Sequence, residues 1–182
     1  RLQEMEALFR GTVEQYPAIA AWRVVLAFLY AELGLEAEAR TQFEQLAAKD
    51  FADLPRDFDW LTNVATLCAV CAFLRDGHRA AILYDLFLPY ARRNLHGGGP
   101  AICWGSAAVS LGLVAATMQR WDDAARHFED ALEMNVRMGG RPWVAHTQHN
   151  YADMLLRRDK PGDREKALAL LTEALDTAQE LG

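Results

Sequence analysis

The sequence has no cluster of Lys and Arg, and its formal net charge at pH 7 is −6. Nucleic acids and anionic membrane surfaces attract basic patches, so the charge balance argues against both as partners. Only three of the 182 residues are Cys, an odd number that argues against a disulfide framework and favours a reducing, cytoplasmic location. The chain begins with Arg1 and carries no signal peptide, so we expect a fragment of a longer protein.

Unbroken apolar runs of membrane-spanning length are also scarce, but Ala101–Gln119 is uncharged over nineteen residues. Its length raises the question of a membrane span, but Gly105, Ser106 and Ser110 interrupt its apolar character. The second half also has the spacing of a packed helix. We therefore expect a buried helix of a soluble protein, with Ile102–Ala108 as its extra leading turn.

The best-defined pattern is Leu111–Met134, which predicts two helices joined by a short polar turn. Its apolar and small residues recur at spacings of three and four, which places them on one stripe of each helix. They are Leu111, Gly112 and Ala115 in the first helix and Ala124, Phe128 and Ala131 in the second. Gly112 and Ala124 allow the two helices to approach closely, and Phe128 is expected to fill the space beside them.

This pattern, Leu-Gly-x2-small followed by Ala-x3-Phe, resembles the tetratricopeptide repeat. Related residues occur around Met5, Ala39, Ala80, Ala124 and Ala167, the later units being longer than the usual repeat of 34 residues. The resemblance implies one all-α domain, a right-handed α-solenoid of antiparallel helix pairs with about nine helices. The expected parts are a half-unit at 1–17 and units at about 21–50, 58–93, 101–138 and 142–182.

The longer units, with Trp121-Asp122-Asp123-Ala124 at one turn and Arg141-Pro142-Trp143 at one helix start, resemble a particular setting. They are similar to helical regions of large bacterial signalling proteins. Those proteins also carry an ATPase domain and either a class III adenylate or guanylate cyclase domain or a LuxR-type DNA-binding domain. The resemblance therefore implies a sensor or interaction module of a signalling or transcriptional regulator, with any catalytic domain outside this fragment.

Tetratricopeptide arrays bind ligands mainly along a concave face formed by the first helix of each unit, and the resemblance transfers that face to this chain. Matching positions are Val24, Phe28, Ala65, Ala69, Val109, Leu113, His149, Asp153 and Arg157. The first six are apolar or small, and the last three are polar. We expect a protein or peptide partner, another domain of the same chain being one option, with a small effector as an alternative.

A different class of function, a metal- or thiol-dependent site on the helical scaffold, is the alternative to partner binding. Cys68 and Cys71 form a Cys-x2-Cys pair, and His146 and His149 share one helix face. Asp153 lies one turn further on the same helix, but the sequence offers no other ligand for the histidines and no second Cys pair, so we interpret the thiols as core residues. We expect no enzyme activity, cofactor or metal in this fragment, and a purely structural spacer is a further alternative.

Two features between the units complete the predictions. Asn94–Pro100 is rich in Gly and is predicted as a loop, and its Gly97-Gly98-Gly99 run lacks the Gly-Lys-Ser/Thr continuation of a phosphate loop. A Trp recurs near the start of each predicted first helix. We interpret Trp22, Trp60, Trp104 and Trp143 as packing residues between repeats.

Overall fold

The computed structural model of the chain describes residues 2–97 and 102–182, with side chains from residue 5 onward. Arg1, Ala101 and the part of the predicted loop at 98–100 therefore lie outside the described residues. Within them the helices are α1 (Leu2–Gln15), α2 (Ala20–Glu32), α3 (Glu36–Ala47), α4 (Trp60–Leu74), α5 (Gly77–Phe87), the 3-10 helix η1 (Leu88–Tyr90), α6 (Ala108–Thr117), α7 (Trp121–Arg137), α8 (Arg141–Arg158) and α9 (Asp163–Leu181). The two strands are β1 (Asn94–Gly97) and β2 (Ile102–Ser106).

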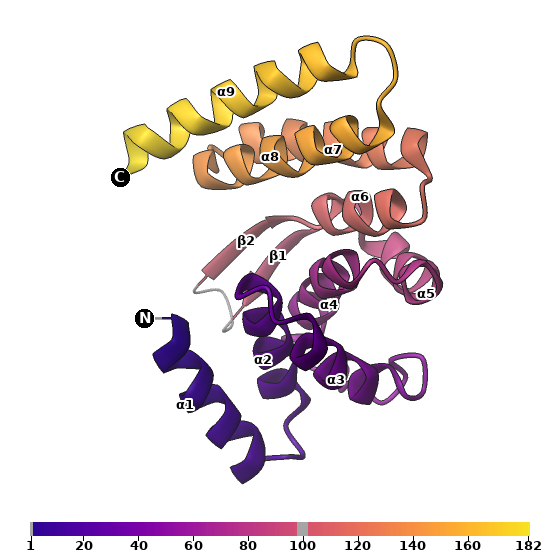
Figure 1. Ribbon diagram of the computed structural model, residues 1–182, viewed down its shortest axis with the longest axis vertical. Coiled ribbons are helices and arrows are strands. Elements are labelled where there is room, and N and C mark those ends of the chain that lie inside the picture. The colour runs from indigo at the N-terminus through magenta and orange to yellow at the C-terminus, as the bar shows by residue number, and fades with distance from the viewer. Residues whose placement is uncertain (1, 98–101) are drawn as a thin grey trace.

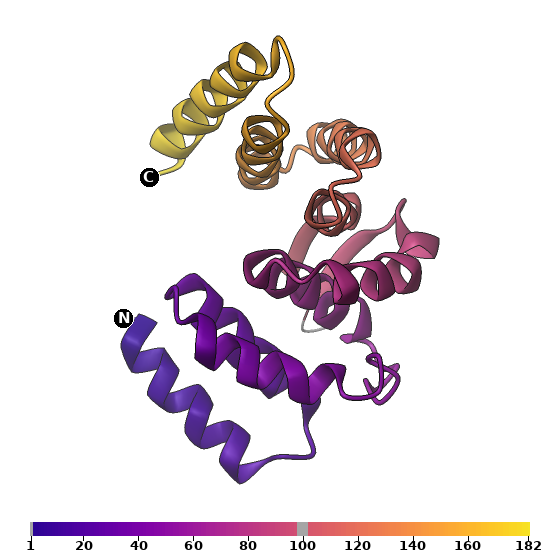
Figure 2. The same ribbon diagram turned by 45° about the vertical axis from the view of Figure 1, so that its right-hand side comes forward.

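The α-helices stack as adjacent pairs, α2 with α3, α4 with α5, α6 with α7 and α8 with α9 (Figure 1). The helix α1 packs against α2 at one end of the stack, and α9 lies at the other end (Figure 2). Each pair has one apolar face that it cannot bury alone, so the neighbouring pair covers it. The predicted helical-repeat fold is confirmed.

Small residues mark the contact between the helices of each pair. Ala39, Ala80, Ala124 and Ala167 begin the apolar stripes of the second helices, and all four are fully buried. In the best-defined unit, a Cβ added to Gly112 would lie 2.8 Å from the Phe128 ring. The predicted close approach of these two helices, with Phe128 beside Gly112, is therefore confirmed.

A β-hairpin between α5 and α6 interrupts the otherwise helical fold, and the sequence did not predict it. The segment 94–97 was expected to be loop and 102–108 to be helix, but β1 and β2 pair antiparallel, with Gly97 opposite Ile102 and a bulge nearer α6. Ile, Cys and Trp at 102–104 suit an extended strand better than a helix start. The uncharged residues before α6 have no clear periodicity, so the sequence pattern did not distinguish a strand from a helix there.

Distant hydrogen bonds hold the hairpin in place. The Thr62 hydroxyl of α4 donates to the backbone carbonyl of His96 at 2.6 Å. The backbone N–H of Ser106 donates to the Asn135 side chain of α7 at 3.0 Å. The hairpin therefore ties the second and third helix pairs together, and it projects toward the side where both chain ends lie (Figure 1).

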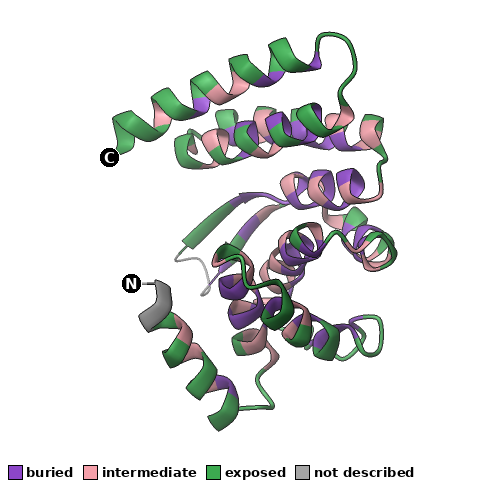
Figure 3. Cartoon of the chain, viewed as in Figure 1, coloured by how far each residue is buried: buried purple, intermediate pink, exposed green. Residues whose placement is uncertain are grey.

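Burial follows the order of the stack. Most residues of α4 and α6, at the centre, are buried or half-buried, whereas α9 is largely exposed (Figure 3). The central helices have neighbours on both sides, whereas α9 packs mainly on α8. Large apolar side chains consequently remain exposed on α9, among them Leu168, Leu175 and Leu181.

Candidate functional site

The structure divides the predicted concave-face residues into two groups. Val24 of α2 and Ala65 of α4 are only 1% and 8% exposed, so they belong to the core and cannot contact a ligand directly. The helices that carry them pack against neighbours on several sides, and the comparison of repeats did not reveal this burial. Placing these two residues on an open face was wrong.

The other apolar residues of that face are half-buried. Phe28, Val109 and Leu113 pack with one side against the core, and Ala69 has intermediate exposure. Each therefore keeps part of its surface open on a first helix of its pair. We call these four residues, which the comparison of repeats predicts to lie on one face, the first-helix stripe.

The polar end of the predicted face lies on α8, where His149, Asp153 and Arg157 are all exposed. An Asp153 carboxylate oxygen lies 3.6 Å from the Arg157 guanidinium. That guanidinium also reaches the preceding pair, donating to the Ala116 carbonyl at 3.5 Å and lying 5.8 Å from the centre of the Trp121 ring. These contacts fix Arg157 while leaving the Asp153 carboxylate exposed to a partner.

A groove of about 480 Å³ lies between α8 and α9. We call it the end groove, and it is lined by Ala145, His146, His149, Leu171, Ala174, Leu175 and Ala178. Its wall is apolar apart from the two histidines. Leu175 is 58% exposed, so the apolar lining of this groove is open to solvent.

Aromatic rings adjoin the end groove on the hairpin side. The Trp104 ring of β2 lies 6.1 Å from the Trp143 ring of α8, and Trp143 meets the His146 ring edge-on at 6.1 Å. Burial of the imidazole in this cluster, with a smaller contribution from the charge of His149, lowers the pKa of His146. Trp104 lies on a strand rather than near a helix start, but its packing between repeats agrees with the prediction.

The Cys residues of the alternative thiol site are both buried. Burial raises the pKa of the Cys68 thiol well above its ordinary value, and it raises that of Cys71 to about 12. The Cys71 Sγ lies 3.3 Å from the Asp76 carbonyl, to which it donates. Thiols of this kind are protonated and shielded, so they suit core packing rather than nucleophilic chemistry.

His146 and His149 are not joined by further metal ligands. The Asn150 amide lies 3.2 Å from His146 Nδ1. Across residues 2–97 and 102–182, no three His, Cys, Asp or Glu side chains are grouped so that they could hold a metal ion. Among the same residues, no helix is both long and apolar enough to cross a membrane.

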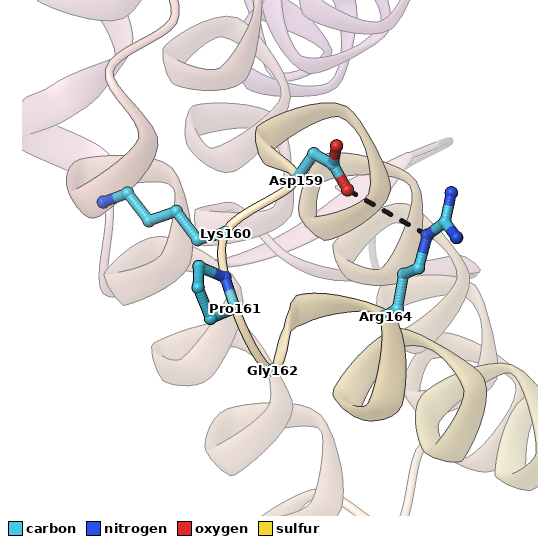
Figure 4. A pocket seen from close by; sticks show the side chains of 5 residues that line it. All are labelled: Asp159, Lys160, Pro161, Gly162 and Arg164. Carbon is cyan, nitrogen blue, oxygen red and sulfur yellow. Dashed lines mark ion pairs between the residues drawn. The ribbon is translucent and has the colours of Figure 1, made fainter.

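A second depression, of about 460 Å³, lies over the α8–α9 turn at Asp159, Lys160, Pro161, Gly162 and Arg164. Its side chains spread apart, with the Arg164 guanidinium 4.0 Å from the Asp159 carboxylate and Lys160 directed to the other side (Figure 4). All five residues are exposed. The arrangement is a solvated turn, as its composition of charged residues, Pro and Gly suggests.

The sequence comparison of repeats missed two features of the structure. His127 of α7 is buried and its Nε2 lies 3.0 Å from the Tyr84 hydroxyl of α5. The sequence comparison also did not single out the leucines of α9, the second helix of the last pair. Leu168, Leu171 and Leu175 follow one another at spacings of three and four residues, which predicts a continuous apolar stripe.

Comparison with known proteins supports the interpretation of the helices. Residues 105–180 match the tetratricopeptide repeat family, so this part of the chain is a tetratricopeptide repeat region. The match covers α6 to α9 and includes the end groove and the polar end of the predicted face. No curated protein and no solved structure matches the chain.

Proposed function

We propose that this chain is a non-catalytic protein-interaction module that binds a protein or peptide partner along the first-helix stripe. The observation that carries the proposal is the tetratricopeptide repeat region at 105–180, because such arrays generally mediate protein–protein interaction. The half-buried Val109 and Leu113 supply apolar contact area in this region. The exposed His149 and Asp153 supply polar groups that fix the register of a bound segment.

The buried location of the reactive side chains in the core supports a binding role rather than a catalytic one. Cys68 and Cys71 are shielded from solvent, and the Tyr84–His127 pair is buried between α5 and α7. A general base must come within hydrogen-bond distance of a substrate proton. These groups leave no open position for a substrate.

We further propose that the module belongs to a larger signalling or transcriptional regulator, where another domain of the same chain is its partner. The support is the resemblance carried by Trp121-Asp122-Asp123-Ala124 and by Arg141-Pro142-Trp143. In such a protein the array would respond to an effector by changing its contacts with a neighbouring domain. A small molecule bound on the same stripe is the second candidate ligand.

Selection of peptides from a random display library on the whole chain tests the binding proposal. The selected peptides are then measured against Leu113→Glu, Asp153→Lys and the control Glu133→Lys, an exposed charge reversal on the outer helix α7. We expect affinity to fall about tenfold or more with the first two variants, a loss of about 1.4 kcal/mol, and to be unchanged with the control. Because Leu113 is half-buried, melting curves must show that its variant remains folded.

Two results would contradict the proposal. One is the failure of any peptide to be enriched on the folded chain. The other is a set of enriched peptides whose affinities are the same for the wild type, Leu113→Glu and Asp153→Lys. Asp153 is exposed and its substitution leaves the core intact, so that variant remains informative if Leu113→Glu unfolds.

A further inference from the structure

The contact between the second and third helix pairs differs chemically from the equivalent positions elsewhere in the stack. Four residues after the alanine that begins the apolar stripe, the second helices carry Phe43 in α3, Tyr84 in α5 and Phe128 in α7. One residue before this position, the following second helices carry Leu83 in α5, His127 in α7 and Leu170 in α9. Successive pairs therefore combine Phe with Leu twice, but Tyr84 with His127 in the middle.

Tyr84 of α5 and His127 of α7 are in direct contact, and we call this contact the middle joint. The Tyr84 hydroxyl lies 3.0 Å from His127 Nε2. The two rings meet edge-on, with 5.6 Å between their centres and 63° between their planes. The residues are only 4% and 5% exposed. The middle joint is thus a buried polar link between the second helices of two neighbouring pairs.

The other ring nitrogen of His127 has no place for a second proton. His127 Nδ1 is buried, and it has no hydrogen-bond partner among the residues that the structure describes. A neutral imidazole carries one N–H, whereas the protonated ring carries two and is charged. Protonation of His127 in the closed joint would therefore bury a charged donor without an acceptor, and opening would let Nδ1 reach water.

Side chains of both signs surround His127. Asp123, Arg126 and Asp130 of α7 act on its charge, as does Arg120 in the turn before α7. The helix α6 has no charged residue, and on α5 the exposed Asp85 follows Tyr84 directly. The helix α8 also packs on α7, and its Arg157 and Arg158 are paired with Asp153 and Asp163.

Arg120 covers the middle joint from outside. Its guanidinium lies 4.4 Å from the centre of the Tyr84 ring, and its Nε donates to the Asp123 carboxylate at 2.8 Å. This hydrogen bond lowers the pKa of Asp123, so the carboxylate remains charged in mild acid. Burial, with a smaller contribution from Arg126, lowers the pKa of His127. A fall in pH from neutrality therefore acts on the imidazole and leaves the Arg120–Asp123 pair ionised.

We propose that the middle joint is a pH-sensitive switch, closed at neutral pH, in which proton uptake by His127 separates α5 from α7 in mild acid. The helix α5 has 11 residues, a length that is not stable without tertiary contacts, so loss of this contact loosens α5 first. Ala69 lies on one side of the joint and Val109 and Leu113 on the other. Control of partner binding by this switch rests on the proposed function, whereas the switch itself does not.

Hydrogen exchange of the whole chain at pH 8 and pH 5 tests the switch. Rates are compared as protection factors, which remove the pH dependence of the chemical exchange step. Protection of α5 should fall several-fold at pH 5, with a limit of about thirtyfold for an opened histidine of ordinary pKa 6.5. Protection of α2 and α3, in the first pair, should remain unchanged.

The chain provides a matched variant for this test. Tyr84→Phe combined with His127→Leu installs the residues that occupy the equivalent positions of the other pairs, Phe43 with Leu83. Protection of α5 in this double variant should be the same at pH 8 and pH 5. His146→Gln is the control, because the pKa of His146 is also lowered, and it should retain the loss seen in the wild type.

Nuclear magnetic resonance of the wild type provides a measurement that needs no variant. The ring signals of Tyr84 should shift with the same midpoint as those of His127, below pH 6.5, because one protonation opens their contact. Three results would overturn the proposal: protection of α5 that falls no more than that of α2 and α3, an undiminished loss in the folded double variant, or Tyr84 signals that stay constant while His127 titrates. If the double variant does not fold, the first and third results still decide.

Discussion

At the scale of single residues, the clearest physical relation is between Gly112 and Phe128. The absence of a Cβ on Gly112 lets the Phe128 ring lie against the backbone of α6, and the ring also stacks on Tyr151 of α8. One fully buried side chain therefore joins three helices. A residue in this position contributes strongly to stability because no neighbouring side chain can replace its contacts.

Replacing Phe128 by Ala should lower the free energy of unfolding by about 3–5 kcal/mol, because a cavity remains among α6, α7 and α8. Chemical denaturation followed by circular dichroism measures the loss. Phe58→Ala is the control, since the Phe58 side chain is 73% exposed and should contribute little. Equal denaturation midpoints for the two variants would contradict this packing arrangement.

Burial and the nearby Arg126 lower the pKa of His127 below its ordinary value of 6.5. The unfolded chain therefore binds more protons than the folded chain once the pH falls below about 6.5. The contribution of neutral His127 to the free energy of unfolding should therefore be fully present above that pH. It should decrease as the pH falls toward the lowered pKa of His127 in the folded chain. Denaturant midpoints measured from pH 8 to pH 5 should show this decrease.

His127→Gln separates this effect from that of His146, whose pKa is also lowered. The variant should lose the Tyr84 contact in its present form and show a weaker dependence of stability on pH than the wild type. His78→Gln serves as the control because His78 is exposed on α5. Identical pH profiles for the wild type and His127→Gln would exclude His127 as the source of the dependence.

At the scale of elements, the turn between α8 and α9 is held by one buried carboxylate. Asp163 accepts hydrogen bonds from the Arg158 guanidinium at 2.6 and 2.8 Å and from the Lys160 backbone N–H at 2.9 Å. These bonds lower the pKa of Asp163 from 3.8 to about 2. The carboxylate thus ties the first residue of α9 to the last turn of α8.

Asp163→Asn should destabilise the chain near neutral pH, since the amide cannot accept both bonds from Arg158. The lowered pKa means that the carboxylate contributes fully above pH 3.8 and loses its contribution as the pH falls toward 2. The difference in melting temperature between wild type and variant should therefore shrink over that acid range. Asp159→Asn, at an exposed position in the same turn, should have little effect at any pH.

At the scale of the whole molecule, burial increases from the ends of the stack to its centre. Cys68 and Cys71 lie in the central helix α4 and are fully buried, whereas Cys103 is exposed on the hairpin. The central thiols can react only after the packed pairs on both sides have opened. Their reactivity therefore reports on unfolding of the array as a whole.

Reaction with a thiol reagent under native conditions should modify one thiol per chain rapidly, and Cys103→Ser should abolish this fast phase. Cys68 and Cys71 should react at least about a hundredfold more slowly, because native opening of the core is rare. Addition of denaturant should make all three thiols react at similar rates. Rapid modification of all three in the native chain would contradict the burial of α4.

The sequence by itself determined the helix pairs and their closest contacts. The stripe from Ala124 to Phe128, together with Gly112, reflects local periodicity and side-chain size, which are properties of residues close in sequence. The repetition of that pattern then indicated that several pairs stack. These features could be read from the sequence because the same interactions are formed in every unit.

Only the tertiary structure decided which of these surfaces remain open. Thr62 and His96, 34 positions apart, meet to hold a hairpin that local pattern did not reveal. Val24 in α2 is 1% exposed, whereas Leu175 in the terminal helix α9 is 58% exposed. Exposure depends on how successive pairs stack in space, and periodicity within one helix does not specify that arrangement.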